Sequence, residues 1–363
     1  MGYCLAEDKH DTQLRSILRD APMPGPVRIA YCREPNYFLG TSVCSKESQT
    51  LIYENQGTVE AMSCRSLKPM FINGEQQNFG YLSGLRLNPT VRNTMVLGRG
   101  YKALKALHND GNSLAYLSTI TRDNIMAKKI LTSKRAGLPV YHDLGQYTTF
   151  CVLFNRFRKY KSGQYRIVQG GEVPLETITL FLREQGKNRQ FYPCYQPEDF
   201  NSSYLRDFRR EDLYLAMKGQ EIIGVVGAWD QSGFKQFHIH GYSPVVKMTK
   251  PVVNTFLRLF GFSSFPEPGS TLRQFTLSFV CIKDENPDIL ASLLQSVYQD
   301  KQKQGYHSFL CGFHEKDSLQ KVLKPFFSIR YHTTLYLVYW PDKGGFNPGS
   351  LDGRLPYLEL AAL

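Results

Sequence analysis

Residues 80–107 read GYLSGLRLNPTVRNTMVLGRGYKALKAL, and this stretch carries the strongest fold signal in the chain. Its first part has the alternating pattern of a β-strand that ends before Pro89. The apolar spacing after Gly100 predicts a helix, and Gly98 and Gly100 predict a loop that leads into it. Free N–H groups at a helix start attract anions, and glycine lets an anion approach the backbone closely.

The elements around this stretch follow from caps, turns and periodicity. In the first half we expect a helix from residue 11 to residue 22, two strands within 50–64 that turn at 55–57, a strand at 78–88, a short helix from about 100 to 108, a strand at 114–120, a helix capped by Asp123 or Asn124 that stops before Gly137, and a strand at 146–154. This order alternates helices with strands and predicts an α+β domain.

The second half repeats that order. We expect a helix opened by Pro174, a hairpin at 212–229 that turns at 218–220, a strand at 272–282, a helix capped by Asn286, a strand at 307–313, a helix near 315–324 and a strand at 328–340. The repeat predicts a duplicated fold. We place the domains at 1–155 and 173–363, and we interpret the basic, glycine-containing segment 156–172 as the linker.

The stretch 80–107 resembles the acyl-CoA-binding core of the Gcn5-related N-acetyltransferase superfamily, which also has a strand, a proline, an arginine, a glycine-containing loop and a helix. Downstream, Asn124 and Ala127 are similar to the Asn-x-x-Ala helix of that family. The resemblance implies two tandem domains of this type, each a mixed, mostly antiparallel twisted sheet flanked by helices. The second half has no glycine loop after its corresponding strand, which implies a degenerate copy.

The resemblance also implies the residues that hold the cofactor. Pantetheine would bond to the main chain of the strand, and the pyrophosphate would rest on the loop and the helix start. The residues implied for this role are Leu85, Arg86, Leu87, Arg92, Gly98, Arg99, Gly100 and Asn124. The family's glycine spacing is incomplete here, because Met95 and Leu97 occupy the glycine positions when the count starts at Arg92. We therefore expect a longer loop that uses Arg92 together with the turn at 98–100.

The implied chemistry is transfer of an acyl group from a thioester to an amine, which needs a base for the amine and an acid for the thiolate. The tyrosine that often supplies the acid corresponds to Leu131 here, so we consider Tyr141 and Tyr147 instead. Base candidates are Glu60 and Glu75, with Tyr81 on the strand itself. The catalytic residues that we predict are Glu75, Tyr81 and Tyr141.

Charge, cysteine spacing and hydropathy indicate the kind of partner, the state of the thiols and the compartment. The net charge of +12 favours an anionic partner such as a phosphorylated cofactor. Eight cysteines have no close pairs, and His238 and His240 lack a third ligand in register, so we predict reduced thiols and no metal. No run approaches the roughly 20 apolar residues of a bilayer-spanning helix, and the first residues lack a signal-peptide pattern. We therefore expect a cytoplasmic protein with no membrane partner.

The resemblance implies an N-acyltransferase, first of all an N-acetyltransferase, that uses acetyl-CoA or a longer acyl-CoA. The acceptor would be an amine of a small molecule or peptide. Two other classes remain open. The irregular glycines and Leu131 favour a CoA-sensing or protein-interaction module without turnover. A tRNA-dependent aminoacyl transferase would fit the charge, because peptidoglycan-branching transferases resemble tandem N-acetyltransferase folds, but no RNA-binding motif supports nucleic acid as a partner.

Overall fold

The computed structural model describes residues 2–23, 25–92, 94–135, 137–158, 164–341 and 345–363. Its strands are β1 (Gly2–Leu5), β2 (Val27–Cys32), β3 (Glu47–Asn55), β4 (Thr58–Ile72), β5 (Glu75–Leu87), β6 (Tyr116–Thr121), β7 (Val140–Leu153), β8 (Arg166–Gln169), β9 (Leu213–Lys218), β10 (Glu221–Trp229), β11 (Gln236–Tyr242), β12 (Gln274–Ile282), β13 (Ser308–His314) and β14 (Ser328–Tyr339). Its helices are α1 (Asp11–Arg19), α2 (Tyr37–Ser42), α3 (Thr94–His108), α4 (Ile125–Leu131), α5 (Leu175–Gly186), α6 (Pro244–Leu259) and α7 (Pro287–Lys303), with a 3₁₀ helix at Ser318–Leu323.

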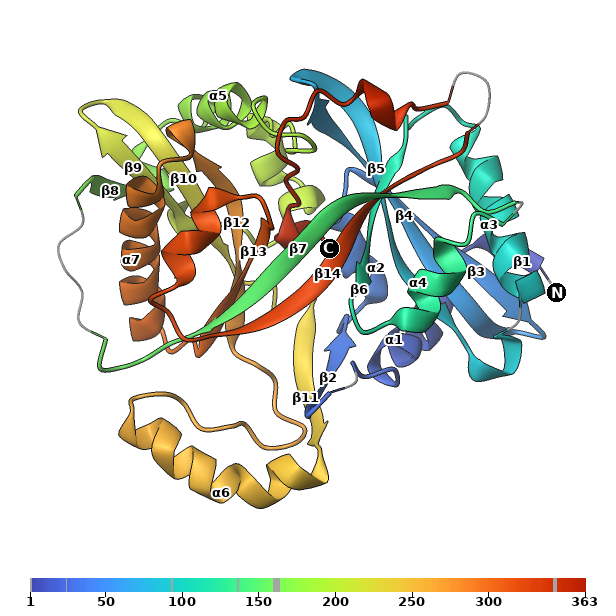
Figure 1. Ribbon diagram of the computed structural model, residues 1–363, viewed down its shortest axis with the longest axis horizontal. Helices are drawn as coiled ribbons and strands as arrows, with labels where there is room; N and C mark the ends of the chain where they lie inside the picture. The colour runs from blue at the N-terminus through green and yellow to red at the C-terminus, as the bar shows by residue number, and fades with distance from the viewer. Residues whose placement is uncertain (1, 24, 93, 136, 159–163, 342–344) are drawn as a thin grey trace.

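Twelve of the described strands form one twisted sheet, in the order β1-β3-β4-β5-β6-β14-β7-β13-β12-β10-β9-β8. Among these strands the parallel pairs are β5–β6 and β12–β13, and the other neighbours are antiparallel. Helices cover the sheet at both ends (Figure 1). The α+β class and the mostly antiparallel sheet predicted from the sequence are confirmed.

The two halves have matching element orders. The series β5–α3–β6–α4–β7 in the first half corresponds to β12–α7–β13–3₁₀–β14 in the second. The last strand of each half lies against the other half: β14 pairs with β6, and β7 pairs with β13. β7 and β14 also pair with each other along their whole length, and they cross the centre of the molecule in Figure 1. The halves are therefore joined by an exchange of strands.

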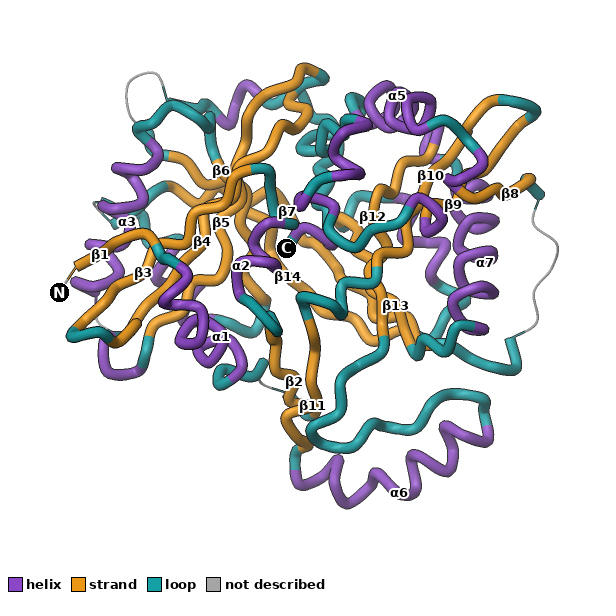
Figure 2. The backbone as a smooth tube through the Cα atoms, turned by 180° about the vertical axis from the view of Figure 1, so that it is seen from behind, coloured by secondary structure: helices purple, strands orange, loops and turns teal. Residues whose placement is uncertain are grey.

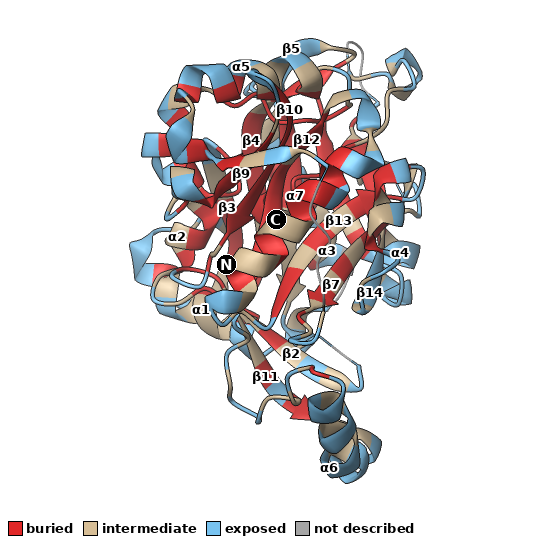
Figure 3. Ribbon diagram, turned by 90° about the vertical axis from the view of Figure 1, so that its left-hand side faces the viewer, coloured by how far each residue is buried: buried red, intermediate tan, exposed pale blue. Residues whose placement is uncertain are grey.

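A second, two-stranded ribbon of β2 and β11 leaves the main sheet and leads to α6. Figure 2 shows the ribbon running from the body of the molecule to this helix. In Figure 3, α6 lies at the end of the molecule, apart from the main sheet. The ribbon joins residues of the two halves, because β2 precedes β3 and β11 follows β10 in the chain.

Different segments of the chain pack on the two faces of the sheet in the first half. On one face, Tyr101 and Leu104 of α3 and Leu131 of α4 pack on the sheet. On the other face, Phe191 and Leu358, which come from the second half, pack against the sheet. In the second half, α5 and α7 contribute to two separate cores. The C-terminal segment is therefore part of the first half's core.

Most elements predicted from the sequence are present, with shifted ends. α3 differs most, because it begins at Thr94 and not near Gly100. The predicted loop at 98–100 is therefore wrong: Gly98 and Gly100 lie inside α3. β1, β2, β8, α2 and α6 were not predicted as elements, and of β11 only His238 and His240 were expected to lie on a strand.

Candidate functional site

The strands β5 and β6 separate in the middle of the first half. They pair in parallel only where Gly80 faces Tyr116 and Tyr81 faces Leu117. At the next step the Ser118 hydroxyl donates to the Leu82 carbonyl over 3.0 Å, so a side chain takes the place of a ladder bond. Beyond Tyr81, none of the described strands pairs with this edge of β5. The sheet is split there, and one edge of β5 is available to an extended ligand.

A β-bulge sets the direction of β5 beside this split. The register with β4 shifts between the pairs Cys64–Ser83 and Met62–Arg86, so two residues of β5, Gly84 and Leu85, oppose the single residue Ser63. One of them, Gly84, has a φ of +65°, a conformation that glycine adopts without steric cost. Bulges of this kind bend a strand away from its neighbour. The bulge therefore accounts for the divergence of β5 from β6.

Two arginines lie at the end of β5. The Arg86 guanidinium donates to the Leu85 carbonyl over 3.0 Å, and the Arg92 guanidinium donates to the Leu87 carbonyl over 3.3 Å. α3 then begins at Thr94, so the positive end of its dipole lies close to these arginines. The two guanidinium groups and this helix end are thus placed together at the open end of the split, and both favour an anion.

Gly98 and Gly100 were expected in a phosphate-binding loop, but both lie inside α3. A Cβ on Gly100 would meet the Tyr3 hydroxyl at 2.7 Å, so this glycine allows α3 to pack closely on β1. A Cβ on Gly98 would meet no atom within 4 Å. Both amides lie beyond the first turn of α3 and are therefore not at the helix start. Arg99 lies on the exposed side of the same helix.

A small cavity lies at the apex of the split, where β5 and β6 still pair. It is lined by Lys68, Met70, Tyr81, Leu117, Phe191, Pro193, Tyr357, Leu358, Glu359 and Leu363. Lys68 comes from β4, and its side chain is only 5% exposed. Burial lowers the pKa of Lys68 to about 8, because a charged amine is poorly solvated there. A lysine in this state can exchange a proton near neutral pH.

Tyr81 is the other functional group from the sheet that lines the cavity. Its hydroxyl lies 2.7 Å from the Thr119 hydroxyl on β6. Burial raises the pKa of Tyr81 to about 12, so the phenol keeps its proton at neutral pH. The cavity therefore combines a buried amine with a buried O–H donor.

Glu359 closes the cavity from the C-terminal segment. Its carboxylate accepts bonds from the hydroxyls of Tyr195 (3.1 Å) and Tyr357 (2.9 Å) and from the N–H groups of Phe279 (2.9 Å) and Ala361 (3.3 Å). Burial raises the pKa of Glu359. Four donors occupy the capacity of this carboxylate, so its main effect is to hold the C-terminal segment in place.

The hydrogen bond from the Phe279 N–H to Glu359 also explains why only the split in the first half is open. β12 and β13 pair at Gln274–Thr276 and Ser308–Leu310 and then diverge, as β5 and β6 do. In this second split the carboxylate of Glu359 bonds to β12, and residues 360–362 lie against β12 and β13. The second split is therefore occupied by the chain itself.

Lys235 fixes the end of the C-terminal segment over the cavity. Its ammonium donates to the carbonyls of Leu363 (2.6 Å) and Ala361 (3.3 Å), and the Gln231 amide donates to Ala361 over 2.8 Å. Burial lowers the pKa of Lys235 to about 8. The next residue in the chain, Gln236, holds the segment that carries Lys235 in place.

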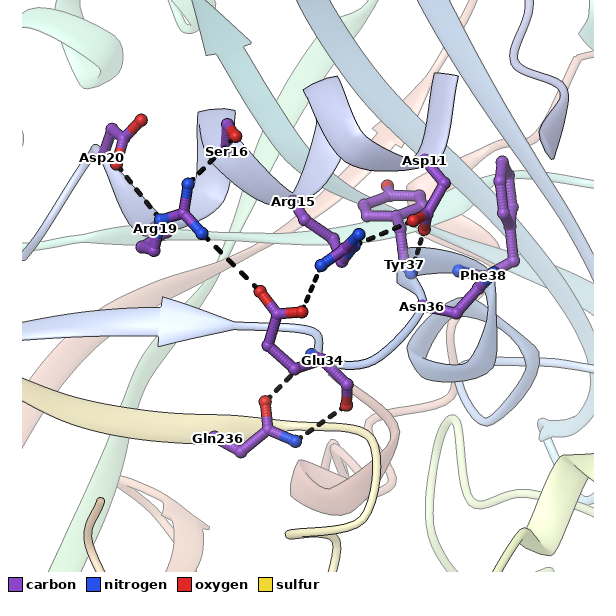
Figure 4. Close-up of polar contacts among 10 residues, drawn as sticks. All are labelled: Asp11, Arg15, Ser16, Arg19, Asp20, Glu34, Asn36, Tyr37, Phe38 and Gln236. Carbon is purple, nitrogen blue, oxygen red and sulfur yellow. Dashed lines mark hydrogen bonds and ion pairs between the residues drawn. The ribbon is translucent and has the colours of Figure 1, made fainter. Parts of the chain in front are cut away.

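Gln236 clamps β11 to the turn before α2. Its side chain accepts from the Glu34 N–H over 3.0 Å and donates to the Glu34 carbonyl over 2.9 Å. The Glu34 carboxylate pairs with Arg15 of α1, and Arg15 donates to Asp11 over 2.8 Å. Figure 4 shows this network between the two halves. It connects the segment that carries Lys235 to the first half.

The predicted catalytic residues do not come together. Tyr81 lines the cavity. Glu75 is exposed and lies six residues before Tyr81, which is about 20 Å along a strand. Tyr141 lies in the core under α3, where its hydroxyl is 2.7 Å from that of Tyr101, and burial raises its pKa to about 12. Glu75 is therefore removed from the cavity, and Tyr141 packs on the other face of the sheet.

Other residues singled out from the sequence make hydrogen bonds that stabilise the fold. The Asn124 side chain accepts from the Ala127 N–H over 3.1 Å and caps α4, as the sequence predicted. The Tyr147 hydroxyl donates to the Leu358 carbonyl over 2.8 Å and so holds the C-terminal segment. His238 lies 3.1 Å from the Thr271 hydroxyl. Among the described residues, no group of His, Cys, Asp or Glu side chains could hold a metal ion.

Lys68 and Glu359 were not predicted from the sequence. A signal for Lys68 was present, because it is a lysine within the strand SCRSLKPMFI, whose other members are largely apolar or small. Lysine is rarely buried without a role. Glu359 had no comparable signal, since only the fold brings it from the C-terminal segment to the cavity.

A split sheet whose inner strand leads into a helix start is the architecture of the Gcn5-related N-acetyltransferase superfamily, and this chain has that fold twice. A structure of Saccharomyces cerevisiae N-myristoyltransferase with bound myristoyl-CoA matches with a TM-score of 0.60 and 11% identity, over 99% of this chain and 89% of that one. Another structure of the same enzyme with bound myristoyl-CoA has a TM-score of 0.58 and 10% identity, over 99% and 85%.

A GCN5-related glucosamine N-acetyltransferase region of a fungal multi-domain β-N-acetylglucosaminidase also matches. Its TM-score is 0.54 at 12% identity, over 83% of this chain and 34% of that one. No family model matches the sequence, and no curated protein gives a significant match. At these identities the likeness concerns the fold, so function has to be argued from the site.

Proposed function

We propose that the protein is an acyl-CoA-dependent N-acyltransferase whose reaction takes place at the split between β5 and β6. The observation that carries the proposal is the cavity at the apex of this split, because it is lined by an amine with a pKa of about 8 and a protonated tyrosine. The fold supports it, since the matched N-myristoyltransferase structures contain myristoyl-CoA.

The thioester would enter along β5. Its pantetheine would bond to the edge of β5 at Ser83–Leu87, as an added strand does. Its pyrophosphate would lie near the start of α3, where the helix dipole and Arg92 favour negative charge. Arg86 and Arg92 would then exchange their carbonyl partners for phosphate oxygens, which are stronger acceptors. Arg99 lies about one turn further along α3 and contributes only through its charge.

Acyl transfer would follow where the split opens beside the cavity, whose volume of about 10 Å³ has room for one water at most. Neutral Lys68 takes a proton from the acceptor ammonium, and the free amine attacks the thioester carbonyl carbon. The new C–N bond forms as the C–S bond breaks, and a backbone N–H of β5 stabilises the oxyanion. The thiolate receives a proton from Tyr81, the resulting tyrosinate takes the remaining excess proton from the attacking nitrogen, and protonated Lys68 returns its proton to solvent. The acceptor is an amine of a small molecule or peptide.

The position of Leu131 favours a second candidate function. This residue is buried in the core under α3, so α4 brings no hydroxyl to the split. A protein that binds acyl-CoA without turnover needs no hydroxyl at this position. Binding and turnover therefore need separate experiments.

The binding experiment measures thermal unfolding with CoA, acetyl-CoA, decanoyl-CoA and myristoyl-CoA. A ligand at 100 times its dissociation constant adds about 2.7 kcal/mol to the free energy of unfolding. Arg92→Glu should abolish most of the shift in melting temperature, whereas Lys218→Glu on the second half should leave it unchanged. If no CoA species raises the melting temperature of the wild-type protein, the proposed function is wrong.

The turnover experiment follows thiol release with a panel of amines, using the thioester that binds best. Lys68→Met should lower kcat by about 100-fold or more, the usual contribution of a general base, and keep the acyl-CoA shift. Lys68→Arg keeps a charge that cannot be removed at neutral pH and should be as inactive. In the wild-type protein kcat should rise with pH through about 8, as Lys68 loses its proton. Binding with no thiol release from any amine would favour the second candidate.

A further inference from the structure

Helix α6 exposes apolar side chains along one side. Val245, Met248, Val252, Phe256 and Leu259 follow one another at intervals of three or four residues, which places them on one face. The side chain of Met248 is 82% exposed, that of Val245 is 70% and that of Leu259 is 68%. None of the residues of α6 is buried. A surface helix normally turns its apolar face to the core, whereas α6 exposes this one to solvent.

The side of α6 that faces the protein carries half-buried Val246, Val253 and Leu257 together with Lys250 and Asn254. The Asn254 side chain accepts from the Phe265 N–H over 2.8 Å. Lys250 pairs with Glu267 over 2.8 Å and lies 5.0 Å from the centre of the Tyr242 ring. The following loop is thus bound to the inward side of α6, and these contacts hold the exposed apolar face outward. The protrusion of the helix from the molecule in Figure 3 agrees with this.

The exposed apolar surface continues onto the end of β7. Phe260 and Phe157 are both exposed, and Phe157 packs against Gly261. Arg156 donates to the Arg258 carbonyl over 3.0 Å, so the end of α6 is bonded to the segment after β7. We call the surface formed by Phe157, Val245, Met248, Val252, Phe256, Leu259 and Phe260 the α6 face.

The charges beside the α6 face have one sign. α6 contains Lys247, Lys250 and Arg258 but no Asp or Glu. Lys250 is neutralised by Glu267, whereas Lys247 and Arg258 are exposed beside the apolar residues. Arg156 adds a further cation at the end of the helix. A second copy of the chain would bring the same cations against these, so the charges oppose self-association through this face.

We propose that the α6 face docks the protein on the surface of a membrane that contains anionic phospholipids. A helix with an apolar face, aromatic residues and flanking Lys and Arg lies in the interface of a bilayer. Its apolar side enters the acyl boundary, and its cations meet the lipid phosphates. None of the described helices is long and apolar enough to cross a membrane, so the protein would lie on the bilayer. From the sequence, the lack of a spanning segment and of a signal-peptide pattern had predicted no membrane partner.

The experiment is co-sedimentation of the full chain with vesicles of phosphatidylcholine alone and of phosphatidylcholine with 30 mol% phosphatidylserine. We expect binding to the anionic vesicles that weakens as salt rises from about 0.05 to 0.5 M, because the charges become screened. Lys247→Gln with Arg258→Gln should weaken this binding about 30-fold, since each basic residue near the surface contributes about fivefold. Met248→Glu with Phe256→Glu should weaken it at least about 100-fold, since two buried apolar side chains are lost.

Leu180→Glu is the matched control for Met248→Glu, because Leu180 is an exposed apolar residue on α5. It should leave vesicle binding unchanged, and all variants should keep the wild-type melting temperature. Equal binding to both vesicle types, or no binding to either, overturns the proposal. A concentration-dependent dimer that Met248→Glu disrupts, in a protein that ignores vesicles, assigns the α6 face to a second copy instead. These outcomes do not depend on acyl-CoA, so the proposed function stands or fails separately.

Discussion

Lys68 couples the stability of this protein to pH. Its pKa is about 8 in the folded protein and about 10.5 in the unfolded chain, so unfolding binds a proton between these values. Stability contributed by this residue therefore rises with pH from about 8 to 10.5. Below pH 8 the amine is charged in both states, and folding has to remove that charge from water.

We predict that Lys68→Met raises the free energy of unfolding most below pH 8. Relative to the wild-type protein, the gain should be up to about 3 kcal/mol at pH 7.5 and should fall toward zero near pH 10.5. Chemical denaturation of both proteins at a series of pH values measures the difference, and other titrating groups cancel in it. A difference that does not change with pH would mean that Lys68 is not desolvated.

Gly80 lies where β5 and β6 meet. A Cβ at this position would come within 2.2 Å of the Tyr116 ring, which is held because the Tyr116 hydroxyl accepts from Arg65 over 3.0 Å. We predict that Gly80→Ala lowers the free energy of unfolding by about 1–3 kcal/mol through overpacking. Gly98→Ala is the control: its Cβ meets nothing, and alanine should stabilise α3 by up to about 1 kcal/mol. Equal effects of the two changes in denaturant titrations would refute this packing.

Chemistry at single positions was only partly predictable. Tyr81 was identified because it is on the strand that resembles the cofactor strand, and that strand is present as β5. Glu75 is on the same strand, but distance along it separates this residue from the cavity. Lys68 and Glu359 come together only through the sheet and the C-terminal segment, which no local pattern reveals.

The clamp between Gln236 and Glu34 joins β11 to the first half. We predict that Gln236→Ala lowers the free energy of unfolding by about 2 kcal/mol, because two hydrogen bonds to the Glu34 backbone are lost. The exposed Gln77→Ala on β5 should have almost no effect. Thermal melting of both variants tests this, and a Gln236→Ala protein as stable as the Gln77→Ala protein would contradict it.

Elements with buried apolar stripes and clear caps were predictable. Asn286 and Pro287 begin α7, and Asn124 caps α4, both as the sequence indicated. α6 was missed although Ser243 caps it, because Pro251 lies inside the helix and normally indicates a break. The start of α3 was misplaced because Gly98 and Gly100 resemble a loop but pack inside the helix. Glycine is ambiguous in this way, since close packing and loops both favour it.

The division of the chain into halves at residue 155 remains a prediction, and the exchange of strands gives a way to test it. β14 lies between β6 and β7 and pairs with both. We predict that a fragment of residues 1–155 does not fold alone, because its sheet lacks β14 and Leu358 is missing from its core. Its NMR spectrum should lack dispersion, and co-expression with residues 156–363 should restore a folded complex. A well-dispersed spectrum of the fragment alone would disprove the prediction.

The late position of β14 also bears on synthesis by the ribosome. About 175 residues separate the end of β7 at Leu153 from the start of β14 at Ser328. At roughly 5–20 residues per second, the nascent first half waits about 10–35 s for its missing strand. During this interval the backbone of β6 and β7 presents unpaired edges to other chains. Chaperones that shield nascent chains should therefore raise the soluble yield of this protein.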